Sequence, residues 1–329
     1  MAGVFDSITI KGLTIKNRLV MPPMATNMAT EDGSVTDRHV THYSTRAEGG
    51  VGLIIVEHTY VTEDGKASRN QLGIYDDKLI AGLKRLTGAI HSHEAKAILQ
   101  ITHAGSKTKR DLTGKQPAGP WNIPVPGGDE SPRPLTVDEI EGIVKTFKEA
   151  ASRAVAAGFD GVELHGAHGF LLGQFISPLV NHRRDKYGGS LEGRLCLPLM
   201  TIAAVRSEIG EDVPLFYRFG ADDMLEGGLT LKEAGVIAPR LEEAGVDVID
   251  ISGGLGGSGR HSEEQGYFVP AAQAIKETVK VPVIGVGNIT EAAYADRVIR
   301  EGKVDLVALG RRLLSAPDFP RQAAKTLGA

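Results

Sequence analysis

Eight short apolar runs, separated by longer segments with helical periodicity, constrain the fold of this chain more than any other feature. Each run is too short for a helix and is typical of a parallel strand buried on both faces. Eight such β/α units within 329 residues predict a closed (β/α)8 TIM barrel formed by residues 1–329 as a single domain. The expected strands are Arg18–Met21, Val51–Val56, Ala97–Ile101, Gly161–His165, Pro214–Phe219, Val246–Ile251, Val281–Val286 and Val304–Leu309.

The segments between these runs carry helix signals at both ends. The expected helices include Asp76–His93, Thr136–Ala157, Leu231–Ala244 and Glu291–Arg300. Residues suited to N-caps begin them, at Asp76, Thr136, Thr230 and Thr290, and glycines suited to helix ends follow two of them, at Gly158 and Gly245.

Two further segments lie outside the repeating units. Residues 8–15 alternate apolar and polar side chains around Lys11–Gly12, which predicts a β-hairpin that closes the bottom of the barrel. The Pro- and Gly-rich stretch from Lys115 to Pro134 predicts a long loop on the face that carries the chemistry.

Composition excludes several classes of protein. The single cysteine, Cys196, rules out an internal disulfide and a cysteine-ligated cluster. The net charge of −4 gives no reason to expect a nucleic-acid or membrane partner. The first twelve residues lack the apolar stretch of a signal peptide, and no apolar run approaches the roughly 20 residues of a membrane span. We therefore expect a soluble, cytoplasmic protein.

Polar residues gather where the predicted strands end, and in a TIM barrel the strand ends carry the chemistry. Alternation along one strand directs Glu163 and His165 into the barrel and Val162 and Leu164 toward the helices. A buried charge needs a partner, so we expect Glu163 to pair with Arg218 across the barrel rather than to act in catalysis. The full set is Glu57, His58, Gln100, His103, Glu163, His165, His168, Arg218, Asp250, Ser252 and Arg311.

The last two units predict a phosphate site. Each strand ends in glycine before a helix, with Gly285 and Gly287 in one unit and Gly310 and Arg311 in the other. Backbone N–H groups and one arginine at this place in a barrel suit a phosphate.

His165 and His168 admit three interpretations. Their spacing permits zinc, but no third ligand stands out, so no metal is expected. A structural pair is the second. The favoured interpretation is two imidazole donors that hold a substrate oxygen on which negative charge develops.

Longer segments resemble the old yellow enzyme family of FMN-dependent ene-reductases, and the resemblance covers essentially the whole chain. The central block, with its histidine pair and the following SPxxNxRxDxYGGS pattern, is the most specific part. The segments are KNRLVMPPM (16–24), VGLIIVE (51–57), LQITHAG (99–105), AGFDGVELHGAHGFLLGQFISPLVNHRRDKYGGSLEGR (157–194) and DLVALGRRLLSAPDF (305–319).

This resemblance implies FMN as cofactor and NADPH or NADH as transient reductant. Reduced flavin N5 would pass hydride to the β-carbon of an activated alkene, and His165 and His168 would bind the carbonyl or nitro oxygen of the substrate. The implied flavin contacts are Pro23, Met24, Ala25, Gln100 and Arg218, with Gly287, Gly310 and Arg311 at the phosphate.

Several positions depart from the family pattern. Phe170 stands where relatives carry a tyrosine proton donor, and phenylalanine has no acidic proton. Ala25 and Asn27 replace a cysteine and a substrate-binding tyrosine, and His58 replaces a small residue. We therefore expect Asn27 and Phe170 to line the substrate pocket. Our hypothesis is that the proton-donor role has been lost or has passed to His58 or Tyr267, although either residue can instead have only a packing role.

The resemblance thus implies an NAD(P)H oxidoreductase that reduces the C=C bond of α,β-unsaturated carbonyl compounds. Two alternatives stay open. One is a flavin dehydrogenase or demethylase that oxidises an amine or a saturated carbonyl, and the other is a flavin-binding subunit with little turnover. A homo-oligomer is possible, as in relatives.

Overall fold

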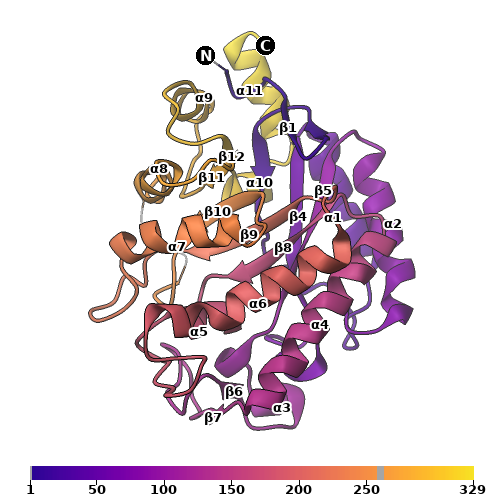
Figure 1. Cartoon of the computed structure of the whole chain (residues 1–329). Coiled ribbons are helices and arrows are strands. Elements are labelled where there is room, and N and C mark those ends of the chain that lie inside the picture. The colour runs from indigo at the N-terminus through magenta and orange to yellow at the C-terminus, as the bar shows by residue number, and fades with distance from the viewer. Residues whose placement is uncertain (1, 258–262) are drawn as a thin grey trace.

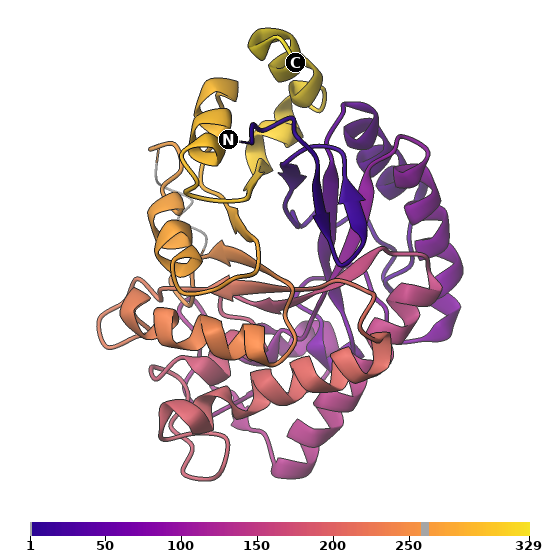
Figure 2. The ribbon, with the colours of Figure 1, turned by 45° about the horizontal axis from the view of Figure 1, so that its top comes forward.

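In the computed structural model of the protein, which describes residues 2–257 and 263–329, eight parallel strands close into a barrel (Figures 1 and 2). The order around the barrel is β10-β11-β12-β3-β4-β5-β8-β9. The predicted TIM barrel is therefore confirmed, and all eight strands fall where apolar runs predicted them. Their bounds are β3 (Leu19–Met21), β4 (Leu53–Tyr60), β5 (Lys96–Thr102), β8 (Gly161–Gly166), β9 (Leu215–Gly220), β10 (Val248–Ser252), β11 (Val283–Gly285) and β12 (Leu306–Ala308).

Helices surround the barrel, and two of the four predicted N-caps, Thr136 and Thr230, directly precede an α-helix. Thr136 and Thr230 each accept a hydrogen bond from the third helical residue, completing capping boxes at α4 and α7. The helices are α1 (Asp37–Glu48), α2 (Ile80–His91), α3 (Arg110–Thr113), α4 (Val137–Ala156), α5 (Leu171–Ile176), α6 (Leu191–Ile209), α7 (Leu231–Glu243), α8 (Val269–Lys276), α9 (Ala292–Arg300), α10 (Gly310–Ser315) and α11 (Phe319–Leu327).

Two predicted helix starts differ in detail. Asp76 caps a 3₁₀ turn, η2 (Asp77–Leu79), that leads into α2. Thr290 is not an N-cap; Glu291 takes that position before α9. The reason is that the Gln265 side-chain oxygen accepts from the backbone N–H groups of both Thr290 and Glu291, which keeps the chain extended for one more residue. Gly158 and Gly245 follow helix ends with positive φ, as expected.

Barrel residues divide into two apolar layers. Val162 and Leu164 join the large cluster between strands and helices, as predicted from alternation. A smaller cluster fills the barrel interior, and Ile10 and Ile15 of the hairpin belong to it. The hairpin pairs β1 (Ile8–Ile10) with β2 (Leu13–Ile15) through the predicted turn at Lys11–Gly12. Its apolar face therefore packs onto the inner core.

The β4 strand is longer than predicted and is irregular. It extends to Tyr60, and its register against β5 shifts between Val56 and Thr59. Such a bulge redirects side chains next to it. Glu57 and His58 lie inside the shift, at the end of the barrel that carries the site.

The long segment 115–134 contains a short parallel pair, β6 (Ala118–Gly119) and β7 (Arg133–Pro134). Two 3₁₀ turns, η1 (Glu63–Gly65) and η3 (Gly105–Lys107), lie in neighbouring loops. In Figure 1, β6, β7 and α3 lie together at one end of the molecule, far from both chain ends.

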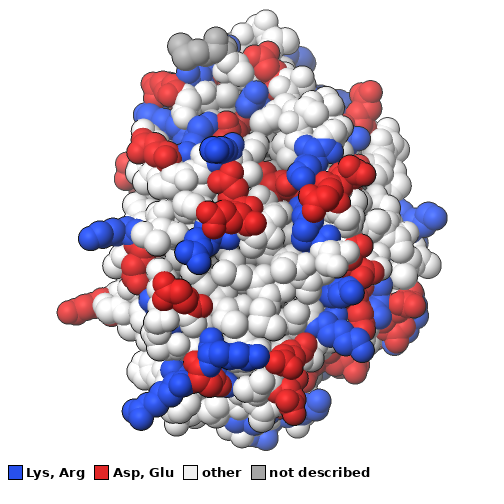
Figure 3. Space-filling model, viewed as in Figure 1, with Lys and Arg blue, Asp and Glu red and all other residues white. Residues whose placement is uncertain are grey.

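None of the helices in the described residues is long and apolar enough to cross a bilayer. Acidic and basic side chains are interspersed over the face seen in Figure 3, with no large patch of one sign.

Candidate functional site

Three histidines and one phenylalanine form a ring cluster at the barrel mouth. His165, at the end of β8, lies 4.4 Å from Phe170 and 5.3 Å from His168 between ring centroids. His58 lies 5.3 Å from Phe170 and 6.5 Å from His165. The structure thus brings together four residues that the sequence singled out from two distant segments.

The His58 ring is held in one tautomer by Gln71. The Gln71 side-chain oxygen accepts from the Ala67 N–H at 2.6 Å, so its amide nitrogen faces His58 and donates to Nδ1 at 2.7 Å. Nδ1 is therefore an acceptor, and Nε2 carries the hydrogen. Burial lowers the His58 pKa to about 4. His58 is consequently a neutral N–H donor near pH 7, and not the imidazolium acid that a proton donor would require.

His165 is also held neutral. Burial, followed by the proximity of His168, lowers its pKa well below the usual value. Its Nδ1 is buried with no hydrogen-bond partner among the described residues. His168 adopts a left-handed backbone, φ 54°, and its Nε2 lies 2.6 Å from Ser252 Oγ at the end of β10. The two imidazoles are thus fixed by different means, one by burial and one by a neighbouring hydroxyl.

Lys107 is a site residue that the sequence analysis missed. Its Nζ donates to the His168 carbonyl oxygen at 2.6 Å and lies 4.9 Å from the Phe170 ring centroid. An ammonium group over an aromatic face is a favourable contact. In the sequence, Lys107 follows the LQITHAG segment by two residues, and no local pattern indicates that its side chain reaches the rings.

A buried carboxylate supports the first loop of the site. Thr26 donates to Glu57 from its backbone N at 2.8 Å and from its hydroxyl at 2.5 Å, and His39 Nε2 lies 3.2 Å away. Burial alone would raise the Glu57 pKa, but the hydrogen bonds from His39 and Thr26 outweigh that effect and hold the pKa below its usual value. Glu57 therefore fixes the loop that carries Ala25 and Asn27, the second of which has a left-handed backbone, φ 53°.

The predicted ion pair between Glu163 and Arg218 is wrong, because each of the two residues contacts a different partner. Glu163 accepts from Gln100 Nε2 at 2.8 Å, and Arg218 pairs with Asp250, Nη1 to Oδ2, at 3.4 Å. Strand register explains both contacts, because Gln100 is opposite Glu163 and Arg218 is opposite Asp250 across neighbouring strands.

The carboxyl groups of Glu163 and Asp250 are both buried, and Arg218 is the cation near them. Burial and the nearby Asp250 raise the Glu163 pKa well above its usual value, with Arg218 opposing the shift. Burial likewise raises the Asp250 pKa, again against Arg218. Both shifts favour the protonated carboxyl groups, so the single Arg218 cation does not offset the burial of the two acids.

The predicted phosphate residues lie at the ends of β11 and β12 and in the segments that follow them. A Cβ on Gly310 would lie 3.1 Å from Met24 Sδ, and one on Gly287, φ 123°, would lie 2.8 Å from the Tyr267 backbone N. Arg311 donates to the Asn288 side-chain oxygen at 3.2 Å. Tyr267 thus lies on this side of the site, where burial raises its pKa and Arg311 and Arg218 oppose the shift.

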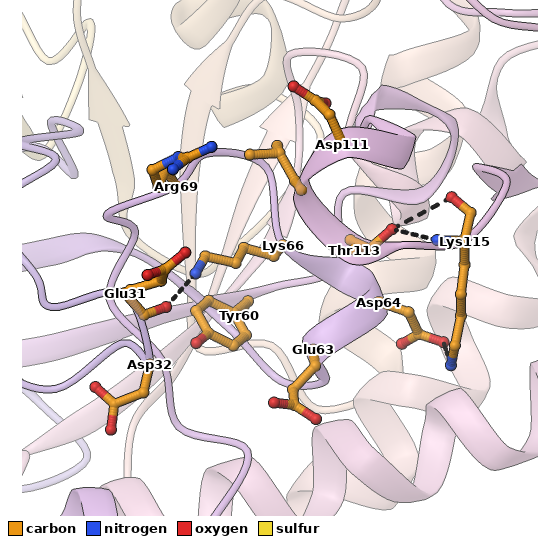
Figure 4. A pocket seen from close by; sticks show the side chains of 11 residues that line it. Glu31, Asp32, Tyr60, Glu63, Asp64, Lys66, Arg69, Asp111, Thr113 and Lys115 are labelled. Carbon is orange, nitrogen blue, oxygen red and sulfur yellow. Dashed lines mark hydrogen bonds and ion pairs between the residues drawn. The ribbon is translucent and has the colours of Figure 1, made fainter.

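Other predicted strand-end residues point elsewhere. His103 Nε2 lies 3.8 Å from Asp64 Oδ1, at the edge of a polar pocket of about 300 Å³ (Figure 4). In that view Lys66 contacts the Glu31 carbonyl oxygen and Lys115 reaches Asp64. Within the described residues, no group of three or more His, Cys, Asp or Glu side chains could hold a metal ion.

The residues present fit a flavin. Buried polar atoms at the barrel mouth lack hydrogen-bond partners among the described residues, and a bound ring with donors and acceptors would satisfy them. They include Glu163 Oε2, His165 Nδ1, Arg218 Nε and Asp250 Oδ1. The last two loops contribute Gly287 and Gly310, whose backbone carries no side chain.

A TIM barrel with this mouth has the features of a flavin-dependent oxidoreductase. The family model described as the NADH:flavin oxidoreductase / NADH oxidase family matches residues 3–329. The chain belongs to this family, which confirms the predicted class of enzyme with FMN and a reduced nicotinamide nucleotide as cofactors.

Individual relatives agree with this assignment. The chain is 48% identical over 327 residues to an NADH oxidase of Thermoanaerobacter brockii, covering 97% of this chain and 50% of that protein. It is 43% identical over 326 residues to an NADPH dehydrogenase of Geobacillus sp. (strain WCH70), covering 99% and 94%. The chain thus spans about half the length of the first relative and nearly all of the second.

Solved structures show the same fold. A 2-naphthoyl-CoA reductase complex superposes with a TM-score of 0.95 at 28% identity, covering 98% of this chain and 52% of that one. An old yellow enzyme homologue from Zymomonas mobilis gives 0.88 at 26% identity, covering 99% and 93%. Morphinone reductase gives 0.86 at 29% identity, covering 99% and 90%.

Proposed function

We propose that this protein reduces the activated C=C bond of α,β-unsaturated carbonyl or related electrophilic compounds at the expense of NADPH or NADH. The observation that carries the proposal is the imidazole pair, His165 and His168, 5.3 Å apart beside Phe170 at the barrel mouth. Hydride addition to the β-carbon places negative charge on the carbonyl oxygen. Two N–H donors directed at that oxygen stabilise the charge as it forms.

The chemistry that FMN supplies when bound is reversible hydride transfer. Pro23, Met24, Ala25 and Gln100 would contact its ring, with Gly287, Gly310 and Arg311 at its phosphate, as the resemblance to old yellow enzymes implies. The Arg218 guanidinium would supply positive charge where the reduced ring is anionic. Asn27 and Phe170 would line the substrate pocket.

Delivery of a proton to the substrate α-carbon is the step for which this site lacks the family's usual donor. Phe170 has no acidic proton, and His58 is neutral, with its Nδ1 engaged by Gln71. Tyr267 lies beside Gly287, on the phosphate side of the site. We infer that water supplies the proton and that this step is slow compared with a tyrosine-containing site.

The test is a stopped-flow measurement in two stages without oxygen. NADPH should bleach the flavin absorbance, and 2-cyclohexenone should restore it with formation of cyclohexanone. His165→Ala and His168→Ala should each slow the second stage by about tenfold or more, whereas His182→Ala, at an exposed position, is the control. If an amine reduces the flavin and the enone fails to reoxidise it, the protein is instead an amine dehydrogenase. If neither NADPH nor an amine reduces the flavin, the protein is a flavin-binding subunit with little turnover.

A further inference from the structure

A pocket of about 530 Å³ lies next to the ring cluster, on the side of Lys107. Lys107 is part of its wall and also contacts His168 and Phe170, so the pocket begins where the proposed reaction site ends. One wall comes from the segment after β5 and the other from the long 115–134 segment. The lining is Ala67, Ser106, Lys107, Thr108, Lys109, Arg110, Asp111, Val125, Pro126, Gly127, Gly128, Asp129 and Glu130.

Two ion pairs join these walls. Lys109 Nζ lies 2.8 Å from Asp129 Oδ2, and Arg110 Nη2 lies 2.5 Å from Glu130 Oε1. The side chains of Lys109, Asp129 and Arg110 are more than half exposed. Ion pairs this exposed contribute little stability, because water competes with each partner. Another anion can therefore take the place of the two carboxylates at low cost.

Phosphate groups suit this replacement. Lys107, Lys109 and Arg110 place three cations within four residues of one wall. An arginine guanidinium binds phosphate oxygens through two parallel N–H donors, and lysine adds a point charge. Val125 and Pro126 on the other wall supply apolar surface for the linker between a phosphate and the reacting group.

We propose that this pocket binds the phosphate-bearing arm of a ligand whose reacting end lies at His165 and His168, with its phosphates replacing Asp129 and Glu130 at Lys109 and Arg110. The proposal rests on the proposed function and extends it to the class of ligand. Two ligands share this chemistry: an unsaturated thioester of a phosphorylated carrier, and the nicotinamide dinucleotide itself.

The polar pocket of Figure 4 is a poorer choice for such an arm. Its lining has five carboxylates and three cations, and it lies beyond Asp111, which lines both pockets. Excess negative charge repels phosphate, whereas the pocket beside Lys107 balances three cations with three acids, two of which are already held by the cations.

Two matched pairs of probes separate the sources. Crotonyl-CoA and S-crotonyl-N-acetylcysteamine present the same alkene with and without phosphates. NADPH and 1-benzyl-1,4-dihydronicotinamide present the same hydride donor with and without phosphates. Stopped-flow measurements give a second-order rate constant for each, and the ratio of phosphorylated to phosphate-free probe isolates the contribution of the arm.

The double variant Lys109→Ala/Arg110→Ala should lower at least one ratio by about tenfold, and Asp129→Asn/Glu130→Gln should raise the same ratio at low salt. A change in the thioester ratio assigns the pocket to the oxidising substrate, and a change in the dinucleotide ratio assigns it to the reductant. Lys145→Ala/Glu149→Gln, an exposed pair on α4, is the control. If neither ratio moves in FMN-loaded, folded variants, the pocket proposal is wrong. If neither thioester reoxidises the flavin, the proposed function fails for this substrate class, and the dinucleotide arm still tests the pocket.

Discussion

Gln71 donates from its amide nitrogen to Nδ1 of His58 at 2.7 Å, and this contact fixes the hydrogen of His58 on Nε2. The sequence marks His58 only as an unusual histidine. In the structure it is a neutral N–H donor beside Phe170 and His165. The arrangement removes His58 as an acid near pH 7 and gives the site a measurable response to acid.

Stability should fall as the pH drops from about 6.5 to about 4. The pKa of His58 is about 4 in the folded protein and near 6.5 in the unfolded chain. The unfolded state therefore binds more protons in this window, and the stability present above pH 6.5 is lost on acidification. The shift corresponds to roughly 3 kcal/mol for complete loss.

Urea unfolding between pH 7 and 4.5 measures this effect. His58→Gln should flatten the pH dependence of the unfolding free energy. Part of the dependence should persist because burial also lowers the His42 pKa to about 4. His182→Gln, at an exposed position, is the control. An unchanged slope in His58→Gln would show that this histidine is not held neutral.

Phe170→Tyr should accelerate reoxidation of the reduced protein by 2-cyclohexenone. A phenol at this position restores a proton donor beside His165, and positioned acids are worth on the order of 10² or more in rate. Phe170→Leu keeps the position apolar and should not accelerate the step. Single-turnover reoxidation followed at the flavin absorbance measures both variants. Equal rates for the tyrosine and wild-type proteins would remove the support for a missing donor.

Gly287→Ala should destabilise the protein and weaken FMN binding. Gly287 has φ 123°, and an added Cβ would meet the backbone nitrogens of Tyr267 and Phe268 at 2.8 and 2.9 Å. Strain and crowding together should cost about 2–4 kcal/mol. Gly302→Ala is the matched control, because φ is also positive there, 72°, but the added Cβ has open space. Similar unfolding free energies for the two variants would contradict the crowding at Gly287.

Arg218→Met should lower the unfolding free energy by about 3–5 kcal/mol, because it leaves two buried carboxyl groups without their cation. The loss should be smallest at acid pH, where both carboxyl groups are protonated. Arg218→Lys retains the charge and should recover part of the stability and of the FMN affinity. Urea unfolding at pH 5 and 8 and FMN titration are the measurements. A methionine variant as stable as the wild type at pH 8 would rule out Arg218 as the compensating charge.

The barrel could be predicted because its strands are buried on both faces, and each therefore appears in the sequence as an apolar run. The β4 bulge at Glu57 and His58 has no such signature, since it depends on pairing with β5. The contact between Glu163 and Gln100 likewise depends on the register of two neighbouring strands, and the sequence pattern of one strand does not determine that register. The contributions of Gln71 and Lys107 arise from loops whose course depends on the packing of the whole barrel mouth. The roles of the predicted site residues stay predictions, as does the assignment of residues 1–329 to one domain.

Anaerobic titration of the purified protein, loaded with FMN and followed by its visible spectrum, tests the central claim most directly. We expect the protein to be yellow, NADPH or NADH to bleach it, and 2-cyclohexenone to restore the colour with stoichiometric formation of the saturated ketone. Protein that does not bind FMN, or bound flavin that stays reduced in excess enone and other activated alkenes, would contradict it.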